Sequence, residues 1–187
     1  MSFSSTVSSV FLPKLSALAT TEESLPQINA IFTKVGRLQF YVVMLIFFGF
    51  FLFGKQFLVI WVGKDFLPAY TYALILMFGL IIPLVQNTGI LILQAKNKHA
   101  FRSIIFVIIA AINVMISIPL AKKYGALACA WVTTSCLLLG QGIILNMYYY
   151  KIIKLDIPAF FKQLLRIFII MCLPVCLFLA VKSHLPF

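Results

Sequence analysis

Five long apolar runs alternate with short polar segments along the chain. Residues 38–54, 66–95, 103–121, 124–150 and 167–181 contain no charged side chain and are rich in Leu, Ile, Val and Phe. A transmembrane helix needs about 20 mainly apolar residues to cross a hydrocarbon core of roughly 30 Å. The pattern therefore predicts an all-α fold, a multi-pass transmembrane helical bundle with five full spans.

The amino-terminal stretch is too short to be a sixth span. Residues 1–13 are small or apolar, but Lys14 follows too early for a complete crossing. The start is Ser-rich and uncharged, unlike the positively charged start of a secretory signal peptide. We expect a half-helix here and divide the chain into a half-helix 1–17, a cytoplasmic loop 18–37, a four-span core 38–150, an interfacial cytoplasmic segment 151–166 and a last span 167–185.

Two segments are expected to depart from a straight transmembrane helix. The run 66–95 is longer than one crossing requires at ~1.5 Å per residue, and Pro83, with Gly79 and Gly89 nearby, offers a place to bend. The segment 155–166, LDIPAFFKQLLR, mixes Phe, Leu and Ile with Lys and Arg. It predicts an amphipathic helix that lies in the cytoplasmic interface.

Composition supports the membrane assignment, and the charges indicate an orientation. The chain is 63% hydrophobic and 10% charged, whereas soluble domains are about 25% charged. The net charge of +11 comes from Lys and Arg residues that separate the spans rather than from one basic face, so we expect no nucleic-acid partner. Connections on one side hold Lys14, Lys34, Arg37, Lys96, Lys98, Arg102, Lys151, Lys154, Lys162 and Arg166. The positive-inside rule makes that side cytoplasmic.

The sequence offers little for catalysis or metal binding. The acidic residues are Glu22, Glu23, Asp65 and Asp156, and all lie outside the apolar runs. The histidines, His99 and His184, have no evident partner. The thiols, which we expect to act as small buried hydrophobes, are Cys129, Cys136, Cys172 and Cys176. General acid–base catalysis and metal sites need several such groups to converge. We therefore expect no catalytic residue, no metal, no cofactor and no enzyme activity.

The candidate functional groups are polar side chains inside the apolar runs. The polar residues of these runs include Thr88 and Asn146, and those we select as candidate site residues are Gln86, Asn87, Asn113, Ser117 and Gln141. Asn113 and Ser117 are four residues apart, so they share one helix face. One interpretation is that these side chains hydrogen-bond between helices and hold the bundle together. The other is that they line a cavity for a polar substrate.

Three stretches carry a family resemblance through their order and spacing: VSSVFLPKLSALATTEESLPQINAIFTKVGR, GKQFLVIWVGKDFLPAY and LILQAKNKHAFRSIIFVIIAAINVMISIPLAKKYGALACAWVTT. Together they resemble polysaccharide flippases of the multidrug/oligosaccharidyl-lipid/polysaccharide exporter superfamily. The similarity extends over nearly the whole chain. Such transporters have two lobes of helices around a central cavity. They move lipid-linked oligosaccharide repeat units across the bacterial inner membrane.

The resemblance implies a role in O-antigen or related polysaccharide assembly, in the bacterial inner (plasma) membrane. The chain would correspond to the carboxyl-terminal lobe, with 1–17 as the remnant of a truncated helix. An amino-terminal lobe or other polysaccharide-assembly proteins would be its partners, besides membrane lipids, and we expect no transport by this lobe alone. The substrate would be an oligosaccharide on undecaprenyl pyrophosphate, with Lys34 and Arg37 as candidate contacts of lipid phosphate. The ordinary role of these two cations is to reach lipid headgroups.

Two other functions stay open. A lobe of a multidrug or cation antiporter from the same superfamily would share the fold, but ion coupling usually uses an ionisable group inside the membrane. A membrane-bound polysaccharide polymerase or ligase is expected to have a larger outer loop with catalytic side chains. The predicted outer turns, around WVGKDFLPAY and AKKYGA, are only a few residues long.

Overall fold

The computed structural model describes residues 13, 18 and 24–184 of the 187-residue chain. Within those residues the chain is helical and contains no β-strand. The elements are α3 (Leu25–Trp61), η2 (Lys64–Phe66), α4 (Pro68–Val85), α5 (Asn87–Ala95), α6 (His99–Tyr124), α7 (Ala126–Leu137), η3 (Leu138–Leu145), α8 (Asn146–Tyr148), η4 (Tyr149–Ile153) and α9 (Ile157–His184). Five segments are long and apolar enough to cross a membrane: Leu25–Trp61, Pro68–Ala95, His99–Tyr124, Ala126–Ile153 and Ile157–Phe178. The predicted all-α bundle of five span-length helices is confirmed.

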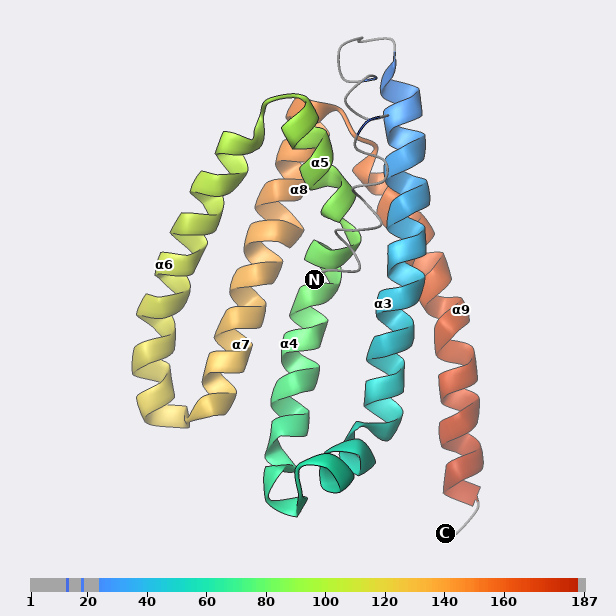
Figure 1. The fold of residues 1–187 in the computed structure, drawn as a ribbon, viewed down its shortest axis with the longest axis vertical. Helices are drawn as coiled ribbons and strands as arrows, with labels where there is room; N and C mark the ends of the chain where they lie inside the picture. The colour runs from blue at the N-terminus through green and yellow to red at the C-terminus, as the bar shows by residue number, and fades with distance from the viewer. Residues whose placement is uncertain (1–12, 14–17, 19–23, 185–187) are drawn as a thin grey trace.

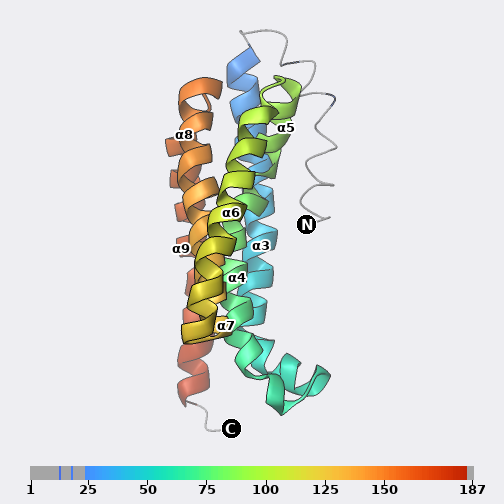
Figure 2. The same ribbon diagram turned by 90° about the vertical axis from the view of Figure 1, so that its left-hand side faces the viewer.

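The spans that contain α6, α7, α4 and α3 stand side by side in a row, and α9 runs obliquely from the end of the α7 span past α3 (Figure 1). Along the row, α6 packs against α7, α7 against α4, α4 against α3, and α3 against α9 (Figure 1). Figure 2 shows the same helices from the α6 side, where they overlap in a narrow band and the connection between α3 and α4 stands out from it. Helix α6 therefore lies at one edge of the bundle, and α3 with α9 lies at the opposite edge.

Consecutive spans run in opposite directions, so the connections fall into two groups at opposite ends (Figure 1). One end carries the short helix η2 and the tight turn at Gly125, whose φ of 73° suits glycine. The other end carries the connections 96–98 and 154–156. We call this second end the basic end, because Lys96, Lys98 and Lys154 lie there. The predicted grouping of the connections is confirmed, and the assignment of the basic end to the cytoplasm stays a prediction.

Helix α3 begins much earlier than the sequence analysis predicts. It starts at Leu25, so the predicted loop 18–37 is wrong from that residue onward. Pro26 suits the first turn of a helix, where its missing N–H has no partner to lose. Ile28 and Phe32 follow at helical spacing, and both are 1% exposed. Packing of this buried face stabilises the helix, and the residues between Ile28 and Phe32 are therefore helical as well.

Helix α9 joins two segments that the sequence analysis separates. The interfacial segment 151–166 and the last span 167–185 were predicted as distinct elements, but one helix extends from Ile157 to His184, so the boundary at 166 is wrong. The buried residues continue across that boundary on one helix face as Ile157, Phe160, Leu164 and Ile167. At its start, Asp156 Oδ1 accepts a hydrogen bond of 3.2 Å from the backbone N–H of Ala159 and caps the helix.

The long run 66–95 is interrupted, close to where the sequence predicts a bend. Helix α4 ends at Val85, and Gln86, with φ −93° and ψ 14°, separates it from α5. Pro83 lies three residues earlier and lacks the backbone N–H that would donate the next hydrogen bond of the α-helix. Gly89 allows α5 to approach Tyr149 closely, because an added Cβ there would lie 2.9 Å from the Tyr149 hydroxyl oxygen. The predicted irregularity is confirmed, and its position is Gln86.

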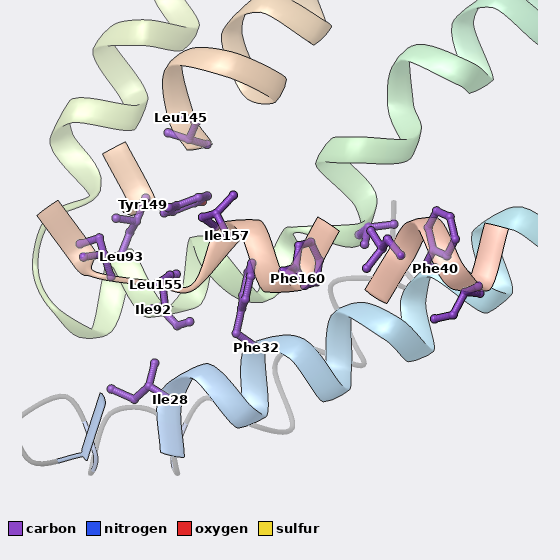
Figure 3. Close-up of a cluster of buried hydrophobic side chains, with 14 of the residues drawn as sticks. Ile28, Phe32, Phe40, Ile92, Leu93, Leu145, Tyr149, Leu155, Ile157 and Phe160 are labelled. Carbon is purple, nitrogen blue, oxygen red and sulfur yellow. The ribbon is translucent and has the colours of Figure 1, made fainter. Parts of the chain in front are cut away.

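A buried apolar cluster at the basic end holds α3, α5, η4 and α9 together (Figure 3). Phe32 and Phe160 are nearly inaccessible, and their ring centroids are 4.6 Å apart. Tyr149 adds a third ring, with its centroid 6.4 Å from that of Phe32. Helices α3 and α9 cross here at close range, because a Cβ on Gly36 would lie 2.5 Å from Phe160 Cε2. The cluster therefore fixes the position of α9 against the rest of the bundle.

The half-helix predicted for 1–17 lies outside the described residues apart from Pro13, and so do Glu22 and Glu23. The side chain of His184 is also outside the described part.

Candidate functional site

The first candidate site joins α6 and α7 through a group of polar side chains. Ser117 Oγ donates a hydrogen bond of 2.9 Å to Asn113 Oδ1, which confirms that these residues share a helix face. Thr133, on α7, places its Oγ1 3.4 Å from both Oδ1 and Nδ2 of Asn113. Asn113 is partly exposed, so its amide is held by neighbours without being sealed from its surroundings. We call Asn113, Ser117 and Thr133 the amide cluster.

A cavity of about 140 Å³ lies beside the amide cluster, between the same two helices. Its polar lining consists of Asn113, Thr133 and Gln141, and its apolar lining includes Phe106 and Ile109. The structure thus brings together two predicted site residues, Asn113 on α6 and Gln141 on η3. It adds Thr133, which the sequence analysis missed because a threonine inside a helix carries no distinctive signal. Amide and hydroxyl groups in an apolar cavity can both donate and accept hydrogen bonds, which suits a neutral polar ligand.

The second candidate site is a buried amide pair between Gln86 and Asn146. Gln86 Nε2 donates a hydrogen bond of 2.7 Å to Asn146 Oδ1, and both side chains are buried, at 3% and 6% exposed. Asn146 Nδ2 in turn donates to the backbone carbonyls of Gln141 (3.1 Å) and Gly142 (2.9 Å). Asn146 was not among the predicted site residues. This amide pair joins α4 and α5 to the last part of the neighbouring span, which is the structural role that interhelical amides often have.

The carbonyls that Asn146 binds belong to an irregular stretch of backbone. The segment η3 is a π-helix, flanked by α-helical residues at both ends. Such π-helical turns are rare and occur often at functional sites. The interruption at Gln86 lies directly opposite, since its side chain reaches Asn146 at the end of η3. Two irregular helices therefore meet at the buried amide pair.

Asn87 does not join its neighbour Gln86. It occupies the first turn of α5, is partly exposed and does not line the cavity beside Asn113. Adjacent residues of a helix point about 100° apart, which explains the separation. The five predicted polar residues thus divide among the amide cluster, its cavity, the buried amide pair and one isolated position.

The predicted phosphate contacts, Lys34 and Arg37, line a groove of about 830 Å³ between α3 and α9. This groove is at the α9 edge of the row, whereas the amide cluster is at the α6 edge (Figure 1). The structure does not bring these cations and the predicted polar residues into one site.

No group of three or more His, Cys, Asp or Glu side chains capable of holding a metal ion occurs among the described residues. The cysteines are all free thiols. Cys136 is buried, as predicted, but Cys176 is exposed on the surface of α9, so the prediction that all four are buried is wrong. Cys176 lies among other exposed apolar side chains of that helix, such as Leu173 and Leu177.

Comparisons with known proteins identify no relative: no protein family, no curated protein and no solved structure matches the chain.

Proposed function

We propose that this chain forms one helical lobe of a flippase that moves lipid-linked oligosaccharide repeat units across the bacterial inner membrane. The single observation that carries the proposal is the amide cluster with its cavity between α6 and α7. A sugar presents many hydroxyl groups, and a path for it through an apolar bundle needs neutral donors and acceptors such as these. Helix α6, with no buried residue, leaves the edge beside this cavity open to a second lobe of helices.

An apolar cleft supports a substrate that carries a lipid tail. It has a volume of about 560 Å³ and lies between α3, α4, η3 and α9. Six phenylalanine side chains contribute to its lining: Phe40, Phe47, Phe48, Phe78, Phe161 and Phe168. A cleft of this composition can cover an isoprenoid chain by dispersion contacts while the head group passes elsewhere.

The other two functions receive less support. An antiporter lobe that couples transport to an ion is disfavoured, because none of the five span-length helices contains Asp or Glu. A polymerase or ligase is disfavoured because the connections opposite the basic end, at 62–67 and 125, are too short to hold a catalytic domain.

Replacing Asn113 with leucine tests the proposal. In cells whose surface polysaccharide depends on this protein, we expect Asn113→Leu to lower polysaccharide export by about tenfold, since one hydrogen-bonding partner contributes ~1–1.5 kcal/mol. The membrane abundance of the variant should match that of the unchanged protein. Export is measured as surface polysaccharide per cell, and abundance by quantitative blotting of membranes.

The matched control is Ser135→Leu, which makes the same polar-to-apolar change at an exposed position on α7. It should alter neither export nor abundance. Loss of the Asn113→Leu protein from the membrane would assign the amide cluster to helix packing, and normal export at normal abundance would remove it from the substrate path.

A further inference from the structure

We propose that the groove between α3 and α9 is a binding site for the headgroup of an anionic phospholipid. The groove has a volume of about 830 Å³ and opens on the surface of the bundle. The wall from α3 carries Asn29, Thr33, Lys34 and Arg37, and the wall from α9 includes Gln163. Two cations with neighbouring amide and hydroxyl groups are the chemistry that recognises a phosphate oxygen.

The lining of the groove keeps a net positive charge, since it contains two cations and one carboxylate among the described residues. Neither Lys34 nor Arg37 forms an ion pair with a described residue, and both side chains are exposed. The carboxylate of Asp156 also lines the groove and offsets one of the two positive charges, while its Oδ1 accepts a hydrogen bond from Ala159 N–H at the start of α9. Asn29 Oδ1 accepts a hydrogen bond of 3.0 Å from the backbone N–H of Asp156, which fixes one wall against the other. Charge complementarity therefore favours an anion.

The level of the groove along α3, just outside the uncharged run, favours a membrane lipid as the source of that anion. Helix α3 has 37 residues, which corresponds to about 55 Å at 1.5 Å per residue, well beyond a ~30 Å hydrocarbon core. Its uncharged run begins at Leu38, directly after Arg37, so Lys34 and Arg37 lie at the level of the lipid headgroups. Leu38 and Val35 add apolar surface to the lining, which suits the glycerol region of a phospholipid. Basic pockets between transmembrane helices bind anionic headgroups in this way.

The position of the groove separates this lipid site from the amide cluster, and its lining residues differ from those of the apolar cleft that also involves α3 and α9. The amide cluster lies between α6 and α7, and α4 with α7 separates it from the α3–α9 edge (Figure 1). A lipid held in the groove would contact α3 and α9 beside the crossing where Gly36 meets Phe160, since Arg37 and Ala159 line the groove. Binding there is expected to stabilise the attachment of α9 to the bundle, because a ligand that binds only the folded state raises its stability.

Thermal unfolding of the purified full chain in the presence of lipid tests this site. We expect phosphatidylglycerol or cardiolipin to raise the melting temperature more than phosphatidylcholine does. The double variant Lys34→Gln/Arg37→Gln should lose most of this selective shift. The matched control Lys122→Gln/Lys123→Gln removes two exposed cations from the other end of the bundle and should retain it.

A second variant keeps both charges and fills the groove. Ala30 lines the groove and is exposed, so Ala30→Trp should fold normally and also lose the selective shift. Retention of the shift in either Ala30→Trp or Lys34→Gln/Arg37→Gln would overturn the proposal. So would stabilisation by inorganic pyrophosphate or undecaprenyl phosphate to the same extent as by phosphatidylglycerol, since the groove would then recognise phosphate from another source.

Discussion

Replacing Gly36 with leucine is expected to push α9 away from α3 and to destabilise the bundle severely. A Cβ at this position would lie 2.5 Å from Cε2 and 2.9 Å from Cζ of Phe160. Phe160 has no room to withdraw, because it is 0% exposed and packs against Phe32 at the centre of the buried cluster (Figure 3). Overpacking of a filled core costs about 1–3 kcal/mol for added methylenes, and a whole leucine side chain belongs at the upper end of that range.

The same helix provides a matched control for this substitution. Gly49 is an exposed glycine of α3, and a Cβ there would meet no atom within 4 Å. Gly49→Leu should therefore leave the melting temperature of the detergent-solubilised protein close to its original value, whereas Gly36→Leu should lower it markedly. Equal melting temperatures for the two variants would contradict the close crossing of α3 and α9.

Replacing Asn146 with leucine is expected to cause the second large loss of stability. This side chain accepts one hydrogen bond from Gln86 and donates to the carbonyls of Gln141 and Gly142. Interhelical hydrogen bonds in membrane proteins contribute ~0.6 kcal/mol on average and up to ~1.7 kcal/mol. The loss of this one interhelical bond and of two bonds to carbonyls of the same span, with the amide of Gln86 left without its partner, should cost about 2–3 kcal/mol.

A double-mutant cycle isolates the contribution of the amide pair. Gln86→Leu alone should lower stability less than Asn146→Leu does, because it removes one bond, and the double variant should be more stable than the two single effects predict by addition. Gln94→Leu, at an exposed position on α5, is the control. The measurement is the free energy of unfolding in a denaturing-detergent titration. Strict additivity of the two changes would show that Gln86 and Asn146 are not coupled.

Gln86 and Asn113 illustrate what the sequence can and cannot predict about polar residues in spans. Both are amides within apolar runs, and the sequence leaves packing and substrate contact open for each. The structure separates them, because Gln86 is buried against a partner 60 residues away, whereas Asn113 is partly exposed beside a cavity. A hydrogen bond between distant segments depends on which helices become neighbours, and no local pattern encodes that choice.

The spans themselves were predictable because hydrocarbon imposes a length and an absence of charge. The errors occurred where the helices extend beyond that constraint. Residues 25–37 contain Lys and Arg, so they were assigned to a loop. Residues 155–166 were predicted as an amphipathic helix, which the structure confirms from Ile157 onward, but as one separate from the last span. The structure continues α3 and α9 through them, because one face of each helix is buried in the cluster around Phe32 and Phe160. Helical periodicity of the apolar residues was the signal that could have revealed the extension of α3, and its continuation past residue 166 was the signal for a single helix α9.

Cysteine labelling in intact cells tests the central claim, that the chain crosses the membrane five times with its basic end in the cytoplasm. After replacement of the native thiols, single cysteines are introduced at Gln27, His99, Asp65 and Ala126, which are exposed and leave every Lys and Arg in place. The cysteines at Asp65 and Ala126 should react with a membrane-impermeant thiol reagent. Those at Gln27 and His99 should react only after permeabilisation. Labelling of Gln27 or His99 from outside, or protection of Asp65 or Ala126, would contradict the account.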